Sequence, residues 1–244
     1  LKMSKSLGNV IAPEDILKKY GADILRIWVA SSNYAEDLRI DYSILDQHAD
    51  SYRKIRNTFR YLLGNINDDF EEINLDKIDI KNLPELEQFM LHKIYLLDLN
   101  FKKYFKNYDF HNLYKDLLNF CTVDLSAFYF DIRKDCLYCD TKDSIKRKST
   151  LLLLKIILNS LLKWFAPILS FTTEEIFKLV SNKKSIHLEK FIDFPTNFKN
   201  EGLNTKWLEL IKIRNICNLS IEEKRADKTL GSSLEASLKI KLNK

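Results

Sequence analysis

The sequence predicts a mainly α-helical protein, folded as a helical bundle, from two observations. Glycine and proline are scarce, with 5 and 4 copies in 244 residues, which disfavours turn-rich β architectures. Apolar residues recur at helical spacing in several long stretches, for example at Ile55, Phe59 and Leu62. Hydrophobic residues make up 45% of the chain and charged residues 30%, so the chain can bury a sizeable core.

Local signals mark where the helices begin and end. Pro13 suits a first helical turn, and Gly21 suits the end of a short helix. Ser43 is the expected N-cap of the first long helix. Thr172 and Glu175 form the pattern of a capping box for a short helix. The expected helices cover residues 14–20, 22–32, from 43 onward, from 84 onward, from about 109 onward, 144–164, 172–180 and 205–227.

Two further stretches are predicted to be non-helical. Residues 181–202 are polar and are expected to form a loop. Leu238, Ile240 and Leu242 alternate with polar residues, which predicts the start of a strand. Because a strand needs a partner, we expect another module to begin there.

The charge balance permits nucleic-acid binding without establishing it. The chain has 39 basic and 34 acidic residues, a net charge of +5, and the two signs are interspersed. The most apolar run, residues 151–158, is interrupted by Lys155 and is shorter than the roughly 20 residues that a membrane span needs. We therefore expect no membrane partner. The chain opens on Leu1 without an initiator Met or a signal peptide, so we expect an internal piece of a cytoplasmic protein.

The cysteines do not predict a metal site. Cys136 and Cys139 have the spacing of half a zinc site, but tetrahedral zinc needs four ligands. No second cysteine pair and no spaced histidine pair follows. We expect reduced, partly buried thiols and no metal ligands in this chain.

One segment has the residue types needed to hold a nucleotide, Lys2-Met3-Ser4-Lys5-Ser6. Lysines provide compact charges that can follow a moving phosphate, and serines provide neutral donors. Such charges would stabilise the negative charge that grows on the phosphates during adenylate formation. The alternative is an ordinary solvated turn. The continuation Leu7-Gly8-Asn9-Val10-Ile11, followed by Pro13, makes the pattern specific.

Residues 1–13 resemble the second signature loop of the class I aminoacyl-tRNA synthetases. Gly21-Ala22-Asp23 resembles the segment that packs behind this loop. The resemblance implies a loop that closes over ATP, which is bound with Mg²⁺. It also implies that Lys5 is the principal catalytic contact to the reacting phosphates and that Lys2 assists it. The remaining ATP-binding positions would be Met3, Ser4 and Ser6.

Longer matches resemble the bacterial type of isoleucyl-tRNA synthetases. The segment Leu25-Arg26-Ile27-Trp28-Val29-Ala30-Ser31 is similar to that family, whereas valyl and leucyl relatives usually depart at the Trp-Val-Ala-Ser step. The resemblance extends over nearly the whole chain and is weakest at residues 66–106 and 181–204. The other similar segments are residues 37–40, 52–65, 108–138, 166–172 and 228–236.

This resemblance implies an isoleucine–tRNA ligase, which activates isoleucine with ATP and transfers it to its tRNA. Its partners would be ATP, isoleucine and the tRNA for isoleucine, with a monomer expected and zinc only in a tail beyond Lys244. The His-Ile-Gly-His signature is absent, so we expect the 244 residues alone to be inactive. A valyl-tRNA synthetase fragment and a non-catalytic tRNA-binding helical module remain alternatives.

The resemblance also implies three regions. Residues 1–42 would be the KMSKS loop and stem-contact segment of the α/β catalytic domain. Residues 43–202 would form the anticodon-binding helical bundle. Residues 203–244 would form a C-terminal helix and the start of the next, junction module.

Within the expected bundle, Arg53, Arg56 and Arg60 stand at i, i+3 and i+7 and would line one helix face. Such a face can contact tRNA phosphates, and the alternative is a solvated face or pairing with neighbouring acids. Lys54 points elsewhere on the helix. For His111 we expect capping or packing. Core packing is also expected for most of Phe128, Tyr129, Phe130, Trp164 and Trp207.

Overall fold

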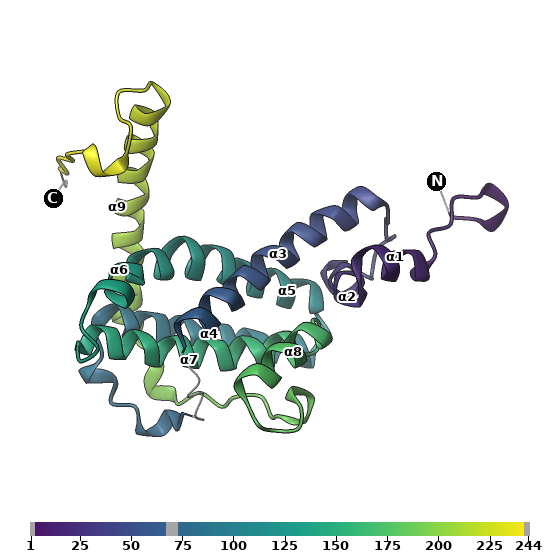
Figure 1. Ribbon diagram of the computed structural model, residues 1–244, viewed down its shortest axis with the longest axis horizontal. Helices are drawn as coiled ribbons and strands as arrows, with labels where there is room; N and C mark the ends of the chain where they lie inside the picture. The colour runs from purple at the N-terminus through teal and green to yellow at the C-terminus, as the bar shows by residue number, and fades with distance from the viewer. Residues whose placement is uncertain (1–2, 67–72, 242–244) are drawn as a thin grey trace. The chain divides into compact units, whose positions relative to one another are not determined.

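The computed structural model describes residues 3–66 and 73–241, with Lys5 described by its backbone only. All regular structure in these ranges is helical and no strand occurs there, so the predicted mainly α fold is confirmed. The chain divides into two compact units, Leu1–Phe198 and Lys199–Lys244. Figure 1 labels α1 to α8 in the first unit and α9 in the second. No helix in the described ranges is long and apolar enough to cross a membrane.

The first unit begins with a 3₁₀ turn and two short helices that meet at a glycine. The turn η1 covers Lys5–Leu7, α1 covers Pro13–Tyr20 and α2 covers Ala22–Ser31. Gly21 lies between the helices with φ 86° and ψ 168°, where a side chain would be strained. Its N–H donates to the Leu17 carbonyl at 3.1 Å, so Gly21 closes α1 and starts α2. The two predicted short helices are confirmed.

The long helix α3 covers Tyr42–Asn65. Its N-cap is Asp41, whose carboxylate accepts a hydrogen bond from the Ile44 N–H at 2.8 Å. The prediction that Ser43 is the N-cap is wrong, because the Ser43 hydroxyl donates to Asp41 at 2.7 Å from within the first turn. A carboxylate at this position also suits the positive end of the helix dipole.

Helix α4 covers Glu85–Lys106 and starts directly after Pro84, as predicted. The elements α5 (Phe110–Asn119), η4 (Phe120–Phe130) and α6 (Asp131–Cys139) form one continuous helix, because the residues at both junctions keep helical angles. The middle element η4 is a π-helix, which the sequence did not predict. Such wide turns are rare and frequently lie at functional sites.

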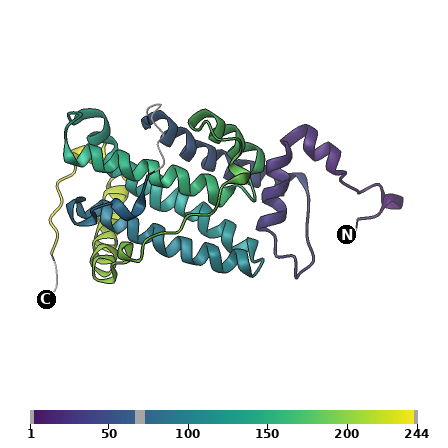
Figure 2. The same cartoon turned by 90° about the horizontal axis from the view of Figure 1, so that it is seen from below.

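Helix α7 covers Ile145–Phe165 and is the central helix of the first unit. It packs against α3, α4, α6 and α8, and Figures 1 and 2 show it running alongside α4. Ser144 is the N-cap, as the predicted start implies, and its hydroxyl accepts from the Arg147 N–H at 3.4 Å. Burying each large apolar side chain of this helix stabilises the fold by about 1.5–3 kcal/mol. Those that are fully buried in its last turns are Leu158, Leu161, Leu162, Trp164 and Phe165.

Helix α8 covers Ser170–Val180, and its predicted capping box of Thr172 and Glu175 is wrong. The Asp23 carboxylate on α2 accepts hydrogen bonds from the N–H of Phe171 at 3.3 Å and of Thr172 at 2.8 Å. It also accepts from the Thr172 hydroxyl at 2.6 Å. A residue from another helix therefore caps α8, and no pattern within the α8 segment can indicate this.

Residues 181–200 form a loop with two 3₁₀ turns, η5 (Ile186–Leu188) and η6 (Thr196–Phe198). The predicted loop, 181–202, is confirmed except at its end, because the next helix begins at Glu201 and not at the predicted residue 205. Aromatic contacts hold this loop on the bundle. The Phe194 ring centroid lies 6.2 Å from that of Trp164 on α7, and the Phe191 centroid lies 5.0 Å from that of Phe101 on α4. Two further 3₁₀ turns precede α4, η2 (Leu75–Lys77) and η3 (Ile80–Asn82).

The second unit contains α9 (Glu201–Ala226) and the 3₁₀ turn η7 (Ser233–Glu235). The side chain of Asn200 caps α9 by accepting from the Leu203 N–H at 3.0 Å. The predicted terminal strand is not found, because residues 236–241 form no strand, and Leu242 lies outside the described residues. The described ranges also contain no other strand with which these residues could pair.

Candidate functional site

The predicted ATP loop is closed by hydrogen bonds of its own. The Asn9 side-chain oxygen accepts from the Ser4 N–H at 2.8 Å. The Leu7 N–H donates to the Ser4 carbonyl at 3.1 Å and closes the turn η1. Gly8 follows with φ 64°, in the left-handed region that favours glycine. These contacts make a compact turn between Ser4 and Asn9.

The described side chains of this loop lie at the surface. Met3 and Ser6 are exposed and Ser4 is half-buried, and the two serine hydroxyls lie 2.7 Å apart. Lys2 lies outside the described residues, and Lys5 is placed only by its backbone, at the start of η1. Paired hydroxyls beside an exposed turn suit a phosphate group, whose oxygens accept several hydrogen bonds.

Two charged residues of α2 join the loop-bearing segment to the bundle. Asp23 caps the N-terminus of α8 from a distance of almost 150 residues along the chain. Arg26 donates from Nε to the Ile168 carbonyl at 2.8 Å and from a terminal nitrogen to the Pro167 carbonyl at 2.7 Å. A carboxylate at a helix N-terminus and a guanidinium just beyond a helix C-terminus both match the helix dipoles. Helix α2 therefore holds the α7–α8 connection at two points.

Sequence reasoning missed this pair as functional residues. It named Asp23 only within the Gly21-Ala22-Asp23 resemblance and assigned Arg26 no role. The available signal was a pair of opposite charges three residues apart on an otherwise apolar helix, since α2 reads Ala22-Asp23-Ile24-Leu25-Arg26-Ile27. Asp23 is buried and Arg26 is exposed, and a buried charge needs partners that the sequence does not name.

The three predicted tRNA-contacting arginines of α3 do not share one environment. Arg56 donates to the Tyr52 hydroxyl at 3.1 Å and to Glu175 of α8 at 3.3 Å. Arg53 pairs with Asp50, one turn earlier. Arg60 is exposed and has no hydrogen bond or ion pair within residues 3–66 and 73–241. Of the three, Arg60 has its full charge available for a partner.

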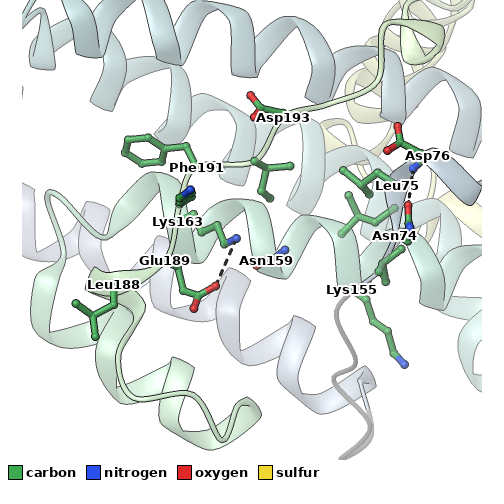
Figure 3. Close-up of a pocket in the computed structure, with 14 residues that line it drawn as sticks. Asn74, Leu75, Asp76, Lys155, Asn159, Lys163, Leu188, Glu189, Phe191 and Asp193 are labelled. Atoms are coloured by element: carbon green, nitrogen blue, oxygen red, sulfur yellow. Dashed lines mark hydrogen bonds and ion pairs between the residues drawn. The ribbon is translucent and has the colours of Figure 1, made fainter.

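A polar recess of about 670 Å³ lies where the loop after α8 crosses α7 (Figure 3). Buried Lys163 of α7 lies 3.9 Å from Glu189, which also pairs with Lys183 at 2.9 Å. Lys102 of α4 pairs with Asp193 of the same loop at 2.9 Å. These ion pairs join acidic residues of the loop to lysines of α4 and α7, so they anchor the loop to both helices.

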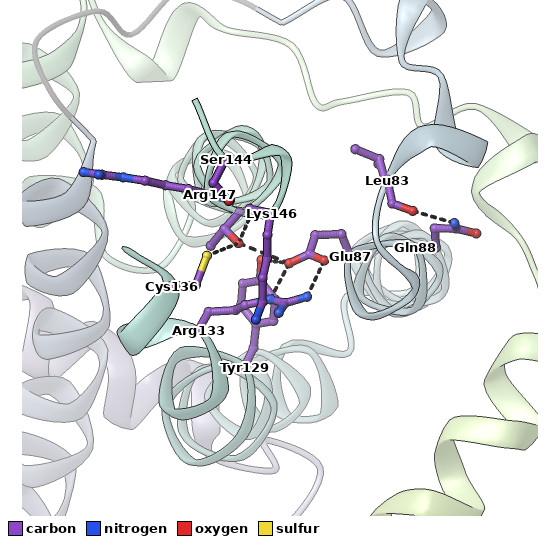
Figure 4. A network of polar contacts seen from close by, with 10 residues as sticks. Leu83, Glu87, Gln88, Tyr129, Arg133, Cys136, Ser144, Lys146 and Arg147 are labelled. Atoms are coloured by element: carbon purple, nitrogen blue, oxygen red, sulfur yellow. Dashed lines mark hydrogen bonds and ion pairs between the residues drawn. The ribbon is translucent and has the colours of Figure 1, made fainter. Parts of the chain in front are cut away.

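A buried polar network joins α4, the η4–α6 helix and α7 (Figure 4). The Glu87 carboxylate accepts two hydrogen bonds from Arg133, at 2.7 and 2.6 Å, and one from the Tyr129 hydroxyl at 2.9 Å. Burial and the charge of Glu87 raise the pKa of Tyr129 well above its usual value, so the phenol stays protonated. Both carboxylate oxygens are satisfied, which indicates a structural role for this network.

The surroundings of the cysteines and of His111 indicate structural roles for these residues. All four cysteines are free, and burial raises the pKa of Cys121 to about 12, so it is a thiol at neutral pH. In the described part of the chain, no group of three or more His, Cys, Asp or Glu side chains is placed to hold a metal ion. His111 Nδ1 is hydrogen-bonded to the Ser31 carbonyl at the end of α2, as expected of a capping residue.

Comparison with known proteins identifies the class. The family model for the anticodon-binding domain of tRNA ligase matches residues 87–241, and that for class I tRNA synthetases (I, L, M and V) matches residues 1–41. The first match covers more than half of the chain. The chain therefore belongs to the family of anticodon-binding domains of tRNA ligases.

The matched relatives narrow this to one member of the class. The chain is 76% identical over 245 residues to the isoleucine–tRNA ligase of Pelagibacter ubique (strain HTCC1062), with 100% of this chain and 27% of the relative covered. It is 43% identical over 237 residues to that of Agrobacterium fabrum (strain C58 / ATCC 33970), covering 97% and 24%. The resemblance to isoleucyl-tRNA synthetases predicted from the sequence is confirmed. The chain spans about a quarter of the length of these relatives.

A solved structure supports the fold. The chain is similar to the Agrobacterium radiobacter K84 agnB2 LeuRS in its ternary complex with tRNA and LeuAMS, with a TM-score of 0.61 and 17% identity. The similarity covers 82% of this chain and 23% of that chain. At this identity, the likeness concerns the fold alone.

Proposed function

We propose that this chain is part of an isoleucine–tRNA ligase, which makes isoleucyl-adenylate from ATP and isoleucine and transfers the isoleucyl group to its tRNA. The observation behind this proposal is the 76% identity to an isoleucine–tRNA ligase along the whole chain. In the proposed enzyme, this chain provides the ATP loop and the tRNA-binding bundle. The amino-acid pocket lies in the rest of the enzyme.

In the proposed reaction, Lys5 is the principal contact to the α-phosphate and the leaving pyrophosphate, and Lys2 assists it. Positive charge at this point stabilises the transition state more than the ground state, because negative charge grows there as the bond breaks. Met3, Ser4 and Ser6 complete the loop, with the two hydroxyls as neutral donors. Mg²⁺ accompanies the ATP and shares the phosphate charge.

The remaining expectations belong to the same proposal. The bundle binds the anticodon arm of the tRNA for isoleucine, with Arg53, Arg56 and Arg60 as candidate contacts. The regions 1–42, 43–202 and 203–244 correspond to the stem-contact segment, the bundle and the start of a junction module. The enzyme acts as a monomer in the cytoplasm, where aminoacylated tRNA is used, and zinc belongs to a tail beyond residue 244.

Isoleucine-dependent exchange of pyrophosphate into ATP by the full-length enzyme tests the proposed function. We expect exchange with isoleucine, and a loss of about 10²–10³ in rate for Lys5→Ala, the usual effect of removing one electrostatic contact to a transition state. Exchange with valine in preference to isoleucine would support the valyl alternative instead. No exchange with either amino acid would support a non-catalytic tRNA-binding module.

A further inference from the structure

A second groove, of about 530 Å³, lies between α3 and the continuous helix of η4 and α6. Its walls come from α3 on one side and from the π-helical segment and the first turn of α6 on the other. The residues that line it are Lys54, Asn57, Thr58, Tyr61, Cys121, Thr122, Ser126, Phe130, Asp131 and Lys134.

The rim of this groove has three polar side chains without partners. Lys54 and Asn57 of α3 and Ser126 of η4 are exposed. The side chains of these three residues make no hydrogen bond or ion pair within the described ranges. A fourth rim residue, Lys134, pairs with Asp131 at 2.9 Å and stays half-exposed. The rim therefore offers one uncommitted cation and two neutral hydrogen-bonding groups within one groove.

Two hydroxyl groups in the groove, those of Thr58 and Thr122, are hydrogen-bonded within their own helices. The Thr58 hydroxyl donates to the Lys54 carbonyl at 3.2 Å, and the Thr122 hydroxyl donates to the Leu118 carbonyl at 2.9 Å. Each satisfies its own helix. A ligand in the groove would therefore be held from the rim.

The aromatic rings of the groove also have partners. The rings of Tyr61 and Phe130 stack on each other, with centroids 4.1 Å apart and planes 18° apart, and Phe130 is buried. Nucleobases bind to proteins by stacking on exposed ring faces, and this groove offers none that is unpaired. Phosphate and ribose need only charge and hydrogen-bonding groups, which the rim supplies.

The surface of α3 beside the groove has further basic side chains. Lys54 and Tyr61 lie on the groove side of the helix, and Arg60 lies on the adjoining exposed face without a partner in the described ranges. Arg53 is on that face as well, paired with Asp50. Cations spaced along one helix beside a groove with a polar rim are complementary to a string of phosphates.

We infer that the groove between α3 and the η4–α6 helix binds the sugar-phosphate backbone of tRNA, with Lys54 as its phosphate contact and Asn57 and Ser126 as hydrogen-bonding groups. This inference rests on the proposed function, because it needs tRNA as the partner. It adds a binding site whose effect is independent of base identity, since backbone contacts give position and affinity without reading sequence.

The test measures dissociation constants of the full-length enzyme for the tRNAs of isoleucine and valine across a salt series. Lys54→Ala should weaken binding of both tRNAs by the same factor, about tenfold at low salt, since a hydrogen bond to a charged group is lost. It should also lower the slope of log affinity against log salt by about one, because one phosphate contact is removed. Lys54→Arg keeps the charge and should stay within about threefold of the wild type.

The matched control is Lys184→Ala. Lys184 is an exposed lysine in the loop between α8 and η5, without a partner in the described ranges, and this variant should bind both tRNAs as the wild type does. Wild-type affinity and salt slope in Lys54→Ala would overturn the inference, and so would a loss confined to the isoleucine tRNA. Isoleucine-dependent exchange by the wild-type enzyme, measured without tRNA, reports on the proposed function separately.

Discussion

Glu87 shows how one buried charge is accommodated in this core. Its side chain is 0% exposed, and Arg133, which is 7% exposed, meets both of its oxygens. Burial alone would lower the pKa of Arg133, but its hydrogen bonds and the charge of Glu87 raise it. Desolvation of two ions offsets most of their attraction, so the pair fixes how α4 meets the η4–α6 helix more than it adds stability.

Removing one partner of this pair is therefore expected to be costly. We predict that Arg133→Met lowers the free energy of unfolding by roughly 3–5 kcal/mol, because it leaves the Glu87 carboxylate buried without a counter-charge. Urea unfolding followed by circular dichroism measures this change.

The double variant with Glu87→Leu should be less destabilised than Arg133→Met alone, since the uncompensated charge is gone. Arg39→Met, at an exposed position, should change stability by less than about 0.5 kcal/mol. A double variant that is less stable than the single one would contradict this account of the network.

The titration of His48 should contribute to the pH dependence of the free energy of unfolding. It is half-buried on α3, and burial lowers its pKa below the usual 6.5. In the unfolded chain His48 takes up a proton as the pH falls through 6.5, while the folded chain still holds the neutral ring. The contribution of His48 is therefore complete above pH 6.5 and is lost as the pH falls from 6.5 through the folded-state pKa.

His48→Gln isolates this contribution, because the other histidines are unchanged. The loss of unfolding free energy between pH 7.5 and pH 5, roughly the window in which an ordinary histidine titrates, should be smaller in the variant than in the wild type. Parallel curves for the two proteins over this window would contradict the assignment.

At the scale of whole elements, helix caps reveal what the sequence can predict. The predicted helix start at about Ser144 is correct, and Ser144 caps the segment that follows it directly. The start near Asp109 was also correct, and the Asp109 carboxylate accepts from the Asn112 N–H at 3.2 Å. The predicted cap at Ser43 is wrong because Asp41 caps α3 instead. The predicted capping box of Thr172 and Glu175 is wrong because Asp23, from another helix, caps α8. Local patterns predict local caps only.

The π-helical η4 and the groove beside Lys54 could not be predicted from local sequence patterns. The π-helical segment packs against α3, and the apolar spacing of its residues gives no sign of its wide turns. The proposed ATP loop stands out in the sequence because its residue types are consecutive. The groove beside Lys54 could not be predicted, because its two walls lie at least 60 residues apart in the sequence.

Asp23 provides the element-scale prediction. Asp23→Ala should lower the free energy of unfolding by about 1–3 kcal/mol, because it removes the cap of α8 and leaves buried donors at Thr172 unsatisfied. Asp37→Ala, at an exposed position without a partner in the described ranges, is the matched control and should change stability by less than about 0.5 kcal/mol. Equal stability of both variants, measured by urea unfolding, would mean that α8 does not depend on this cap.

At the scale of the first unit, the proposed ATP loop and the proposed tRNA-binding surface belong to the same compact unit. The loop leads into α1 and α2, and α2 packs on α3, α5 and α8 of the bundle. Asp23 and Arg26 add charged contacts at both ends of the α7–α8 connection. Through these contacts, α2 would connect an ATP bound at the proposed loop to a tRNA bound at the bundle.

Binding of the 244-residue chain to tRNA transcripts for isoleucine, valine and leucine, across a salt series, tests the central claim most directly. If the bundle binds the anticodon arm as proposed, the chain should bind all three tRNAs with an affinity that falls as salt rises. At raised salt its affinity should be highest for the isoleucine tRNA. Affinity no higher than that of an unrelated helical protein of equal net charge, with no difference among the three tRNAs, would contradict it.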